Sequence, residues 1–319
     1  MIAFIFPGQG SQQVGMGRAL AEAYPIARAT FDEADAAFAR AGGPDLQVRL
    51  SDLCFTGPED QLALTEITQP AILTVSVAAW RVLDAHGIRP AFVAGHSLGE
   101  YSANVAAGTF AFGDAVSTVR RRGRYMQEAV PVGHGAMAAV LGSDAATVQQ
   151  ACDEAAQGDI VSPANINGPG QVVIAGTVAA VERASARAKA LGARRVVALQ
   201  VSAPFHCALM KPAEDRLAPE LRALEVQDPR MPIVANVDAE PRRDGRSAVD
   251  ALVRQVSSPV RWEDVVLRLA SEGVTTYVEV GPGTVLGGLV RKIHTDAHIM
   301  HFGSPEDLEA VVAATQGTP

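Results

Sequence analysis

Short runs of apolar, β-branched residues alternate along this chain with longer segments whose apolar residues recur at helical spacing. This alternation predicts a mainly parallel sheet covered by helices, so the expected fold class is α/β. The predicted strands of the sheet are residues 2–6, 91–94, 232–237, 275–280 and 297–302. The predicted helices are residues 71–85, with Pro70 in the first turn, then 100–107, 248–256, 262–271 and 284–294, with others starting at residue 207 and after residue 305.

Between residues 136 and 201 the elements become shorter and follow a regular order. We predict strand 136–141, helix 145–156, strands 160–165 and 171–175, helix 178–191 and strand 195–201. This βαββαβ order is typical of a ferredoxin-like unit, which closes its own four-stranded antiparallel sheet under two helices. We therefore predict a ferredoxin-like insert at residues 130–200 within a discontinuous α/β domain formed by residues 1–129 and 201–319.

Composition and charge exclude several classes of protein. Of the 319 residues 48% are hydrophobic, and 27 Lys and Arg against 35 Asp and Glu give a net charge of −8. An acidic chain with few aromatic residues is a poor candidate for nonspecific nucleic-acid binding. Three scattered cysteines without a CxxC pair favour a reducing compartment, and no apolar run approaches the length of a membrane span. We expect a cytoplasmic monomer that binds neither nucleic acid nor membrane.

The segment Gly95-His96-Ser97-Leu98-Gly99 has the form GxSxG between a predicted strand and a predicted helix. The two glycines permit a sharp turn that raises the Ser97 hydroxyl out of the sheet. The backbone N–H of Leu98 then lies at a helix N-terminus, where negative charge is stabilised. The pattern predicts a serine nucleophile, and the alternative is a glycine-rich turn with a capping serine.

A serine nucleophile needs a base, and the chain has seven histidines. We choose His206, because a strand end and Pro204 project its loop toward the same edge of the sheet. The group that orients the imidazole stays open at this point. Glu279 and Asp238 are candidates by position, and a backbone carbonyl is the alternative.

Several motifs together resemble bacterial malonyl-CoA:acyl carrier protein transacylases, from Met1 to about His294. They are Phe6-Pro7-Gly8-Gln9-Gly10-Ser11-Gln12, Gly95-His96-Ser97-Leu98-Gly99-Glu100, Met126-Gln127-Glu128-Ala129, Gly135-Ala136-Met137, Pro204-Phe205-His206-Cys207, Asn236-Val237-Asp238 and Glu279-Val280-Gly281-Pro282-Gly283. The resemblance implies a hydrolase-like α/β domain with a ferredoxin-like insert. It also implies ping-pong transfer of malonyl from malonyl-CoA through Ser97 to the pantetheine thiol of acyl carrier protein, in fatty acid biosynthesis.

The same resemblance assigns roles to individual residues of this chain. Ser97 would be the nucleophile and His206 its base, held by the main-chain carbonyl of Gln255. Gln9 and Leu98 would supply the backbone N–H groups of the oxyanion hole. Arg122 would bind the free carboxylate of malonate, since a planar guanidinium binds carboxylates bidentately and stays charged when buried.

Other residues are predicted to shape the pocket or to meet the carrier protein. Phe205, beside the base, would narrow the pocket in favour of malonyl over α-branched groups. Asn165 and Asn167, near the predicted hairpin turn at residues 168–170, are candidates for substrate contact. An acidic carrier protein requires a local basic patch, and the candidates are Arg194, Arg195, Arg291 and Lys292.

Several motifs and functions are disfavoured. The segments Gly8-Gln9-Gly10 and Gly281-Pro282-Gly283 lack the third glycine of the dinucleotide fingerprint, and His294, His298 and His301 fall in a segment predicted partly as a strand, so we expect neither a metal nor a redox cofactor. Arg120, Arg121 and Arg124 leave a solvated basic helix face as the alternative for Arg122. The rival functions are a trans-acting acyltransferase of a polyketide or malonate pathway and a serine thioesterase.

Overall fold

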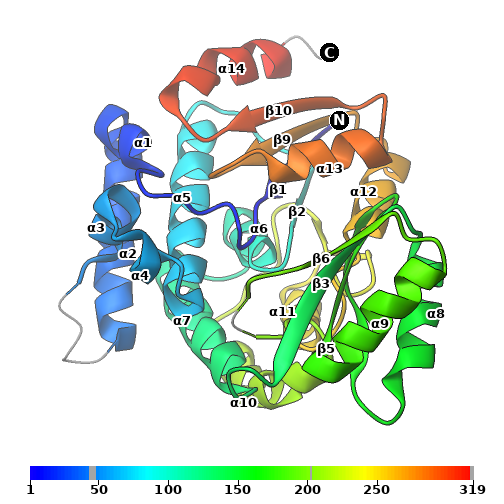
Figure 1. Ribbon diagram of the computed structural model, residues 1–319. Helices are drawn as coiled ribbons and strands as arrows, with labels where there is room; N and C mark the ends of the chain where they lie inside the picture. The colour runs from blue at the N-terminus through cyan, green and yellow to red at the C-terminus, as the bar shows by residue number, and fades with distance from the viewer. Residues whose placement is uncertain (43–47, 202, 317–319) are drawn as a thin grey trace.

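A six-stranded, mainly parallel sheet forms the centre of the molecule (Figure 1). The computed structural model describes residues 1–42, 48–201 and 203–316. In the order of the sheet, the strands are β10 (His298–Phe302), β9 (Thr276–Val280), β1 (Ile2–Phe6), β2 (Phe92–Gly95), β7 (Ile233–Val234) and β8 (Pro241–Arg242). Neighbouring strands are parallel except for the edge pair of β7 and β8. The predicted α/β class is confirmed.

Helices cover both faces of this sheet, because alternate residues of the buried strands point to opposite sides. Phe4 and Phe6 of β1 pack into the larger core, and Ala3 and Ile5 pack into the smaller one. The larger core is covered by α1 (Arg18–Ala23), α2 (Pro25–Gly42), α3 (Leu50–Thr56), α4 (Glu59–Leu62), α5 (Thr65–Ala85), α6 (Gly99–Ala107), α7 (Phe112–Glu128), α10 (Lys211–Arg222), α11 (Gly245–Gln255) and α14 (Leu308–Gln316). The smaller core is covered by α12 (Trp262–Ser271) and α13 (Val285–Ile293).

A second, antiparallel sheet is built by consecutive residues of the chain, to the lower right in Figure 1. Its strands run in the order β4 (Val161–Gly168), β5 (Gln171–Thr177), β3 (Gly135–Leu141) and β6 (Arg195–Ala198), with α8 (Ala145–Ala156) and α9 (Val178–Ala190) packed on one face. The elements follow one another in the predicted βαββαβ order, and the sheet is four-stranded and antiparallel as expected for a ferredoxin-like unit. The exact division at residues 130 and 200 stays a prediction.

The second sheet is tied to the first domain through β4. The backbone N–H of Val260, just before α12, donates to Ala164 O at 2.9 Å, and the N–H of Ile166 donates back to Val260 O at 2.9 Å. These two bonds join β4 to the segment just before α12, and Asn167 of the same strand bonds to His96 in the turn after β2.

Several predicted elements have other bounds in the structure; for example, the predicted strand 195–201 ends at Ala198. Helix α5 begins at Thr65, so the prediction that Pro70 lies in the first turn is wrong. Pro70 gives up one backbone hydrogen bond inside the helix, and burial of nearly every following side chain compensates for it. The predicted strand 232–237 shrinks to Ile233–Val234, because Asn236 leaves the sheet and bonds with both polar ends of its amide to the turn after β2.

Within the residues that the structure describes, no helix is long and apolar enough to cross a membrane.

Gly99, the first residue of α6, permits a very close approach to β1. A methyl group on its Cα would lie 2.0 Å from the carbonyl oxygen of Phe6. We expect Gly99→Ala to lower the free energy of unfolding by about 2 kcal/mol or more, because the backbone must shift to relieve the overlap. At Gly288 in α13 a methyl group meets nothing within 4 Å, so Gly288→Ala should keep or slightly raise stability. Urea unfolding of both variants measures the difference, and equal midpoints would contradict the prediction.

Candidate active site

Ser97 occupies a strained turn between β2 and α6. Its φ of 52° lies in the left-handed region, which a serine rarely adopts. The turn is too tight for side chains at its ends, since a methyl group at Gly95 would lie 2.0 Å from the carbonyl carbon of Gly99. The Ser97 backbone N–H donates to Asn236 Oδ1 at 2.7 Å, which holds the turn in place. The structure therefore has the raised serine that the GxSxG spacing predicts.

His206 meets this serine directly. Its Nε2 lies 2.7 Å from Ser97 Oγ, and its Nδ1 lies 3.0 Å from the main-chain oxygen of Gln255 at the end of α11. Because a carbonyl oxygen only accepts hydrogen bonds, Nδ1 carries the proton and Nε2 is free to accept one from the hydroxyl. His206 also has a positive φ, of 60°.

The two acidic candidates for orienting His206 lie elsewhere. Glu279 accepts hydrogen bonds from the backbone N–H groups of Leu286 and Gly287 at the start of α13. Asp238 pairs with Arg242 and Arg254. The structure thus places neither carboxylate at the imidazole, and the position is taken by the main-chain carbonyl.

Burial is the main reason why the pKa of His206 is lowered to about 3, and the positive charge of Arg122 adds to the effect. The imidazole is only 3% exposed. A pKa in this range leaves the ring neutral at physiological pH, which is the state that a general base requires.

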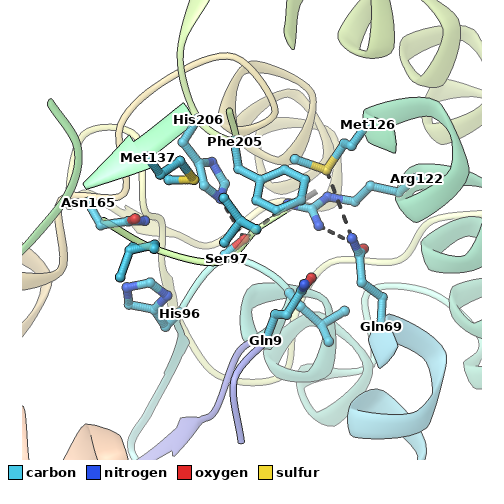
Figure 2. A pocket seen from close by; sticks show the side chains of 13 residues that line it. Gln9, Gln69, His96, Ser97, Arg122, Met126, Met137, Asn165, Phe205 and His206 are labelled. Carbon is cyan, nitrogen blue, oxygen red and sulfur yellow. Dashed lines mark hydrogen bonds between the residues drawn. The ribbon is translucent and has the colours of Figure 1, made fainter. Parts of the chain in front are cut away.

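Arg122 reaches the same hydroxyl from α7 (Figure 2). Its Nη2 donates to Ser97 Oγ at 3.1 Å and to Gln255 Oε1 at 2.9 Å, and its Nη1 donates to Gln69 Oε1 at 2.7 Å. The side chain is 1% exposed, and burial lowers the pKa of its guanidinium below the usual value. No carboxylate lies within salt-bridge distance of it among the described residues.

The neighbouring arginines do not share this arrangement. Arg121 pairs with Glu220, and Arg124 pairs with Glu128 one turn further along α7. Arg120 stacks on Phe38 and donates to its carbonyl oxygen. Arg122 is therefore not part of a solvated basic face.

Ser97, His206 and Arg122 surround one cavity of about 160 Å³. Its wall also contains Gln9, Leu98, Met137, Asn165 and Phe205, as predicted for four of these five (Figure 2). Among the described residues, no acceptor takes a hydrogen bond from the backbone N–H of Gln9 or Leu98. A second cavity of about 230 Å³ shares Gln9, His96 and Asn165 with the first and is lined further out by Asn167.

Asn167 lies in the outer cavity and bonds to the residue before the serine. Its Oδ1 is 2.9 Å from His96 Nε2, and Figure 2 shows the His96 ring pointing away from Ser97.

The four predicted carrier-patch residues are exposed and, among the described residues, form no ion pair: Arg194, Arg195, Arg291 and Lys292. His301 lies beside Asp307, and no three potential metal ligands gather anywhere in the described part of the chain.

Three buried polar side chains of the site were not found by sequence reasoning: the amide of Gln255, of which only the main-chain carbonyl was predicted, and the side chains of Glu100 and Gln69. Gln255 Nε2 donates to Ser97 O at 2.9 Å and to Glu100 Oε2 at 2.7 Å, and that carboxylate oxygen also accepts the Asn236 N–H. Burial raises the pKa of Glu100 to about 7. Gln69, the third, contacts Arg122. A polar residue within an otherwise apolar helical stretch, such as Gln69 or Glu100, is the sequence feature that could have indicated a buried site residue.

Comparison with known proteins agrees with this geometry. The model of the acyl transferase domain family matches residues 3–301. The malonyl CoA-acyl carrier protein transacylase of Bacillus subtilis is 47% identical over 98% of this chain and 96% of its own length, and that of Escherichia coli O157:H7 is 54% identical over 91% and 92%.

Solved structures that are similar to this chain belong to proteins of the same kind. An acyl carrier protein S-malonyltransferase from Vibrio cholerae is 47% identical, with a TM-score of 0.93 over 97% of this chain and 99% of its own. A malonyl-transacylase solved in complex with its type II PKS acyl-carrier protein is 45% identical, with a TM-score of 0.92 over 99% of both chains. This chain therefore belongs to the acyl transferase domain family and, within it, to the malonyl CoA-acyl carrier protein transacylases.

Proposed function

We propose that this chain transfers malonyl from malonyl-CoA to the pantetheine thiol of acyl carrier protein, in fatty acid biosynthesis, through a malonyl-serine intermediate on Ser97. The observation that carries the proposal is the buried guanidinium of Arg122, 3.1 Å from the Ser97 hydroxyl and without a carboxylate partner among the described residues. A buried cation beside a nucleophile favours an acyl group that brings its own anion. Malonyl is such a group, and the names of the relatives support the choice.

In the first half-reaction, Ser97 Oγ attacks the thioester carbonyl while its proton passes to His206 Nε2 over the 2.7 Å hydrogen bond. The Gln255 carbonyl keeps the other ring proton on Nδ1 and stabilises the imidazolium that forms. The backbone N–H groups of Gln9 and Leu98 bind the oxyanion. His206 then returns its proton to the departing CoA thiolate.

In the second half-reaction, the carrier thiol takes the place of CoA. His206 removes the thiol proton, the sulfur attacks the malonyl-serine carbonyl, and the proton returns to Ser97 as the ester bond breaks. Both steps are acyl transfers with no change of oxidation state and with His206 as the base, so we propose that the enzyme needs neither a metal nor a redox cofactor. Ser97, His206 and Arg122 all come from one chain, so we also propose that it acts as a monomer. The three cysteines are free and buried, in keeping with a cytoplasmic location.

The carrier protein is expected to approach over the basic patch. Gly168 of the β4–β5 hairpin lies against Ile293 of α13, and the N–H of Gly142 bonds to the carbonyl of Gly170 in the same hairpin, next to Arg194. Both pairs of basic residues therefore flank this hairpin. The outer cavity lies between the hairpin and α13 and shares Gln9, His96 and Asn165 with the cavity that contains Ser97, which suits a pantetheine arm.

A polyketide carrier protein is the second candidate acceptor. It is favoured by the similarity to the malonyl-transacylase that was solved with a type II PKS acyl-carrier protein. Both acceptors present the same pantetheine thiol, so the chemistry at Ser97 is unchanged.

We expect Ser97→Ala to lose covalent malonylation, because the acyl-accepting oxygen is removed while the surrounding turn is kept. Intact-protein mass spectrometry after incubation with malonyl-CoA measures this. For the malonylated wild type, a chase with fatty-acid or polyketide carrier protein then identifies the acceptor. Stoichiometric labelling of the variant would show that the nucleophile lies elsewhere.

We expect Arg122→Ala to lower kcat/KM for malonyl transfer by a factor on the order of 10² or more, because the carboxylate loses its charged partner. Transfer of acetyl, which has no carboxylate, should fall much less. Steady-state assays with both acyl-CoA substrates test the difference. Equal losses for the two would rule out selective recognition of the carboxylate.

We expect the double charge reversal Arg291→Glu with Lys292→Glu to raise KM for acyl carrier protein about tenfold, with less effect at high salt. Transfer to free pantetheine should stay unchanged, because the small thiol does not need the patch. An unchanged KM for the carrier protein would remove these two residues from the docking surface.

A further inference from the structure

Gln69 is the third polar side chain that hydrogen-bonds to the Arg122 guanidinium, besides Ser97 and Gln255. It lies on α5, is 2% exposed and lines the acyl cavity. Its Oε1 accepts from Arg122 Nη1 at 2.7 Å, and its Nε2 lies 3.9 Å from Met126 Sδ (Figure 2). It contributes no group to the two half-reactions described above.

The orientation of this amide is determined by its neighbours. A guanidinium only donates hydrogen bonds, so the oxygen end of Gln69 has to face Arg122. The nitrogen end then faces the Met126 thioether, which is a weak acceptor. Gln69 therefore fixes the direction of Nη1 while Gln255 fixes that of Nη2 from the other side.

Both of these partners are neutral, and this sets Arg122 apart from Arg121 and Arg216. Arg121 is held by the carboxylate of Glu220, and Arg216 by that of Glu128. A carboxylate partner would hold the guanidinium equally well but would cancel its charge. An amide oxygen orients the cation and leaves the charge in place.

We propose that Gln69 is a specificity-determining residue, which positions Arg122 through a neutral acceptor so that the full positive charge is available to the free carboxylate of the acyl group. The inference rests on the proposed role of Arg122 and adds a requirement at a different residue. The structure carries it through three facts: the 2.7 Å contact, the burial of both side chains, and the lack of a carboxylate partner for Arg122 among the described residues.

Glutamate has nearly the shape of glutamine, so Gln69→Glu changes the charge at this contact and little else. The new carboxylate would form an ion pair with Nη1 and would repel a malonyl carboxylate arriving at the same guanidinium. An acetyl group brings no charge and should be accepted as before. We expect kcat/KM for malonyl transfer to fall about 100-fold and that for acetyl transfer to change less than about threefold.

The experiment measures acylation of the full chain by malonyl-CoA and acetyl-CoA, with intact-protein mass spectrometry to follow the acyl-serine. The control is Gln227→Glu, which makes the same change of charge at an exposed position and should match the wild type. A malonyl to acetyl ratio equal to that of the wild type would overturn the inference. Equal loss for both substrates would overturn it too, since it indicates a merely structural role.

If far-UV circular dichroism shows that Gln69→Glu does not fold, a second variant tests the inference. Gln69→Met is neutral and similar in length but has no oxygen for Arg122. We expect it to raise KM for malonyl-CoA about three- to tenfold and to leave that for acetyl-CoA unchanged, and an unaltered malonyl KM would overturn the inference. If the wild type itself is not malonylated at Ser97, the proposed function fails instead.

Discussion

The Arg122 guanidinium is buried and has no carboxylate partner in the part of the chain that the structure describes, and this is the constraint on which the site depends. Moving an unpaired charge out of water is costly, and the fold meets that cost with two amide oxygens, the Ser97 hydroxyl and the ring of Tyr101, 5.3 Å from the guanidinium carbon. The same charge helps to lower the pKa of His206, because the imidazole and the guanidinium share one oxygen as partner. An anion bound at Arg122 would weaken this repulsion, so a substrate with a free carboxylate also makes the base stronger.

Gln255 connects the parts of the site that come from distant segments of the chain. Its main-chain oxygen orients His206, and its side chain bonds to Arg122, to the backbone of Ser97 and to Glu100. A carboxylate at the orienting position would have placed a negative charge close to Arg122 and weakened its attraction for the substrate. A carbonyl oxygen fixes the imidazole tautomer without that penalty. The choice of a main-chain carbonyl at His206 and of amides at Arg122 thus follows from one electrostatic requirement.

The βαββαβ order of the second sheet and the serine turn were predictable from the sequence, because both depend on local patterns, whereas helices α1–α4 and α7 were not predicted. Strand β1, helices α8 and α12, and the ferredoxin-like order follow from periodicity and turn residues. The position of Pro70 in the interior of helix α5 was not predictable, because tertiary burial stabilises the helix on both sides of a residue that locally marks a helix start. Glu279 and Asp238 were plausible by position alone, whereas the real partner of His206 is a backbone atom, which no side-chain pattern marks. Gln69 and Glu100 escaped notice because a polar residue in a helix suggests exposure, and only tertiary packing buries it.

The insert completes the site and also helps to explain how a thioester and then a thiol use it in turn. Asn167 of β4 holds His96 next to the nucleophile, and Asn165 borders both cavities. The inner cavity of about 160 Å³ is lined by one hydroxyl, one imidazole and one guanidinium, so it has room for a single acyl group. The outer cavity adjoins the inner one at Gln9, His96 and Asn165, and CoA and the carrier protein share the pantetheine arm that would fill it. Two such arms cannot reach one serine together, so CoA has to leave before the carrier enters, and the malonyl group has to wait on Ser97.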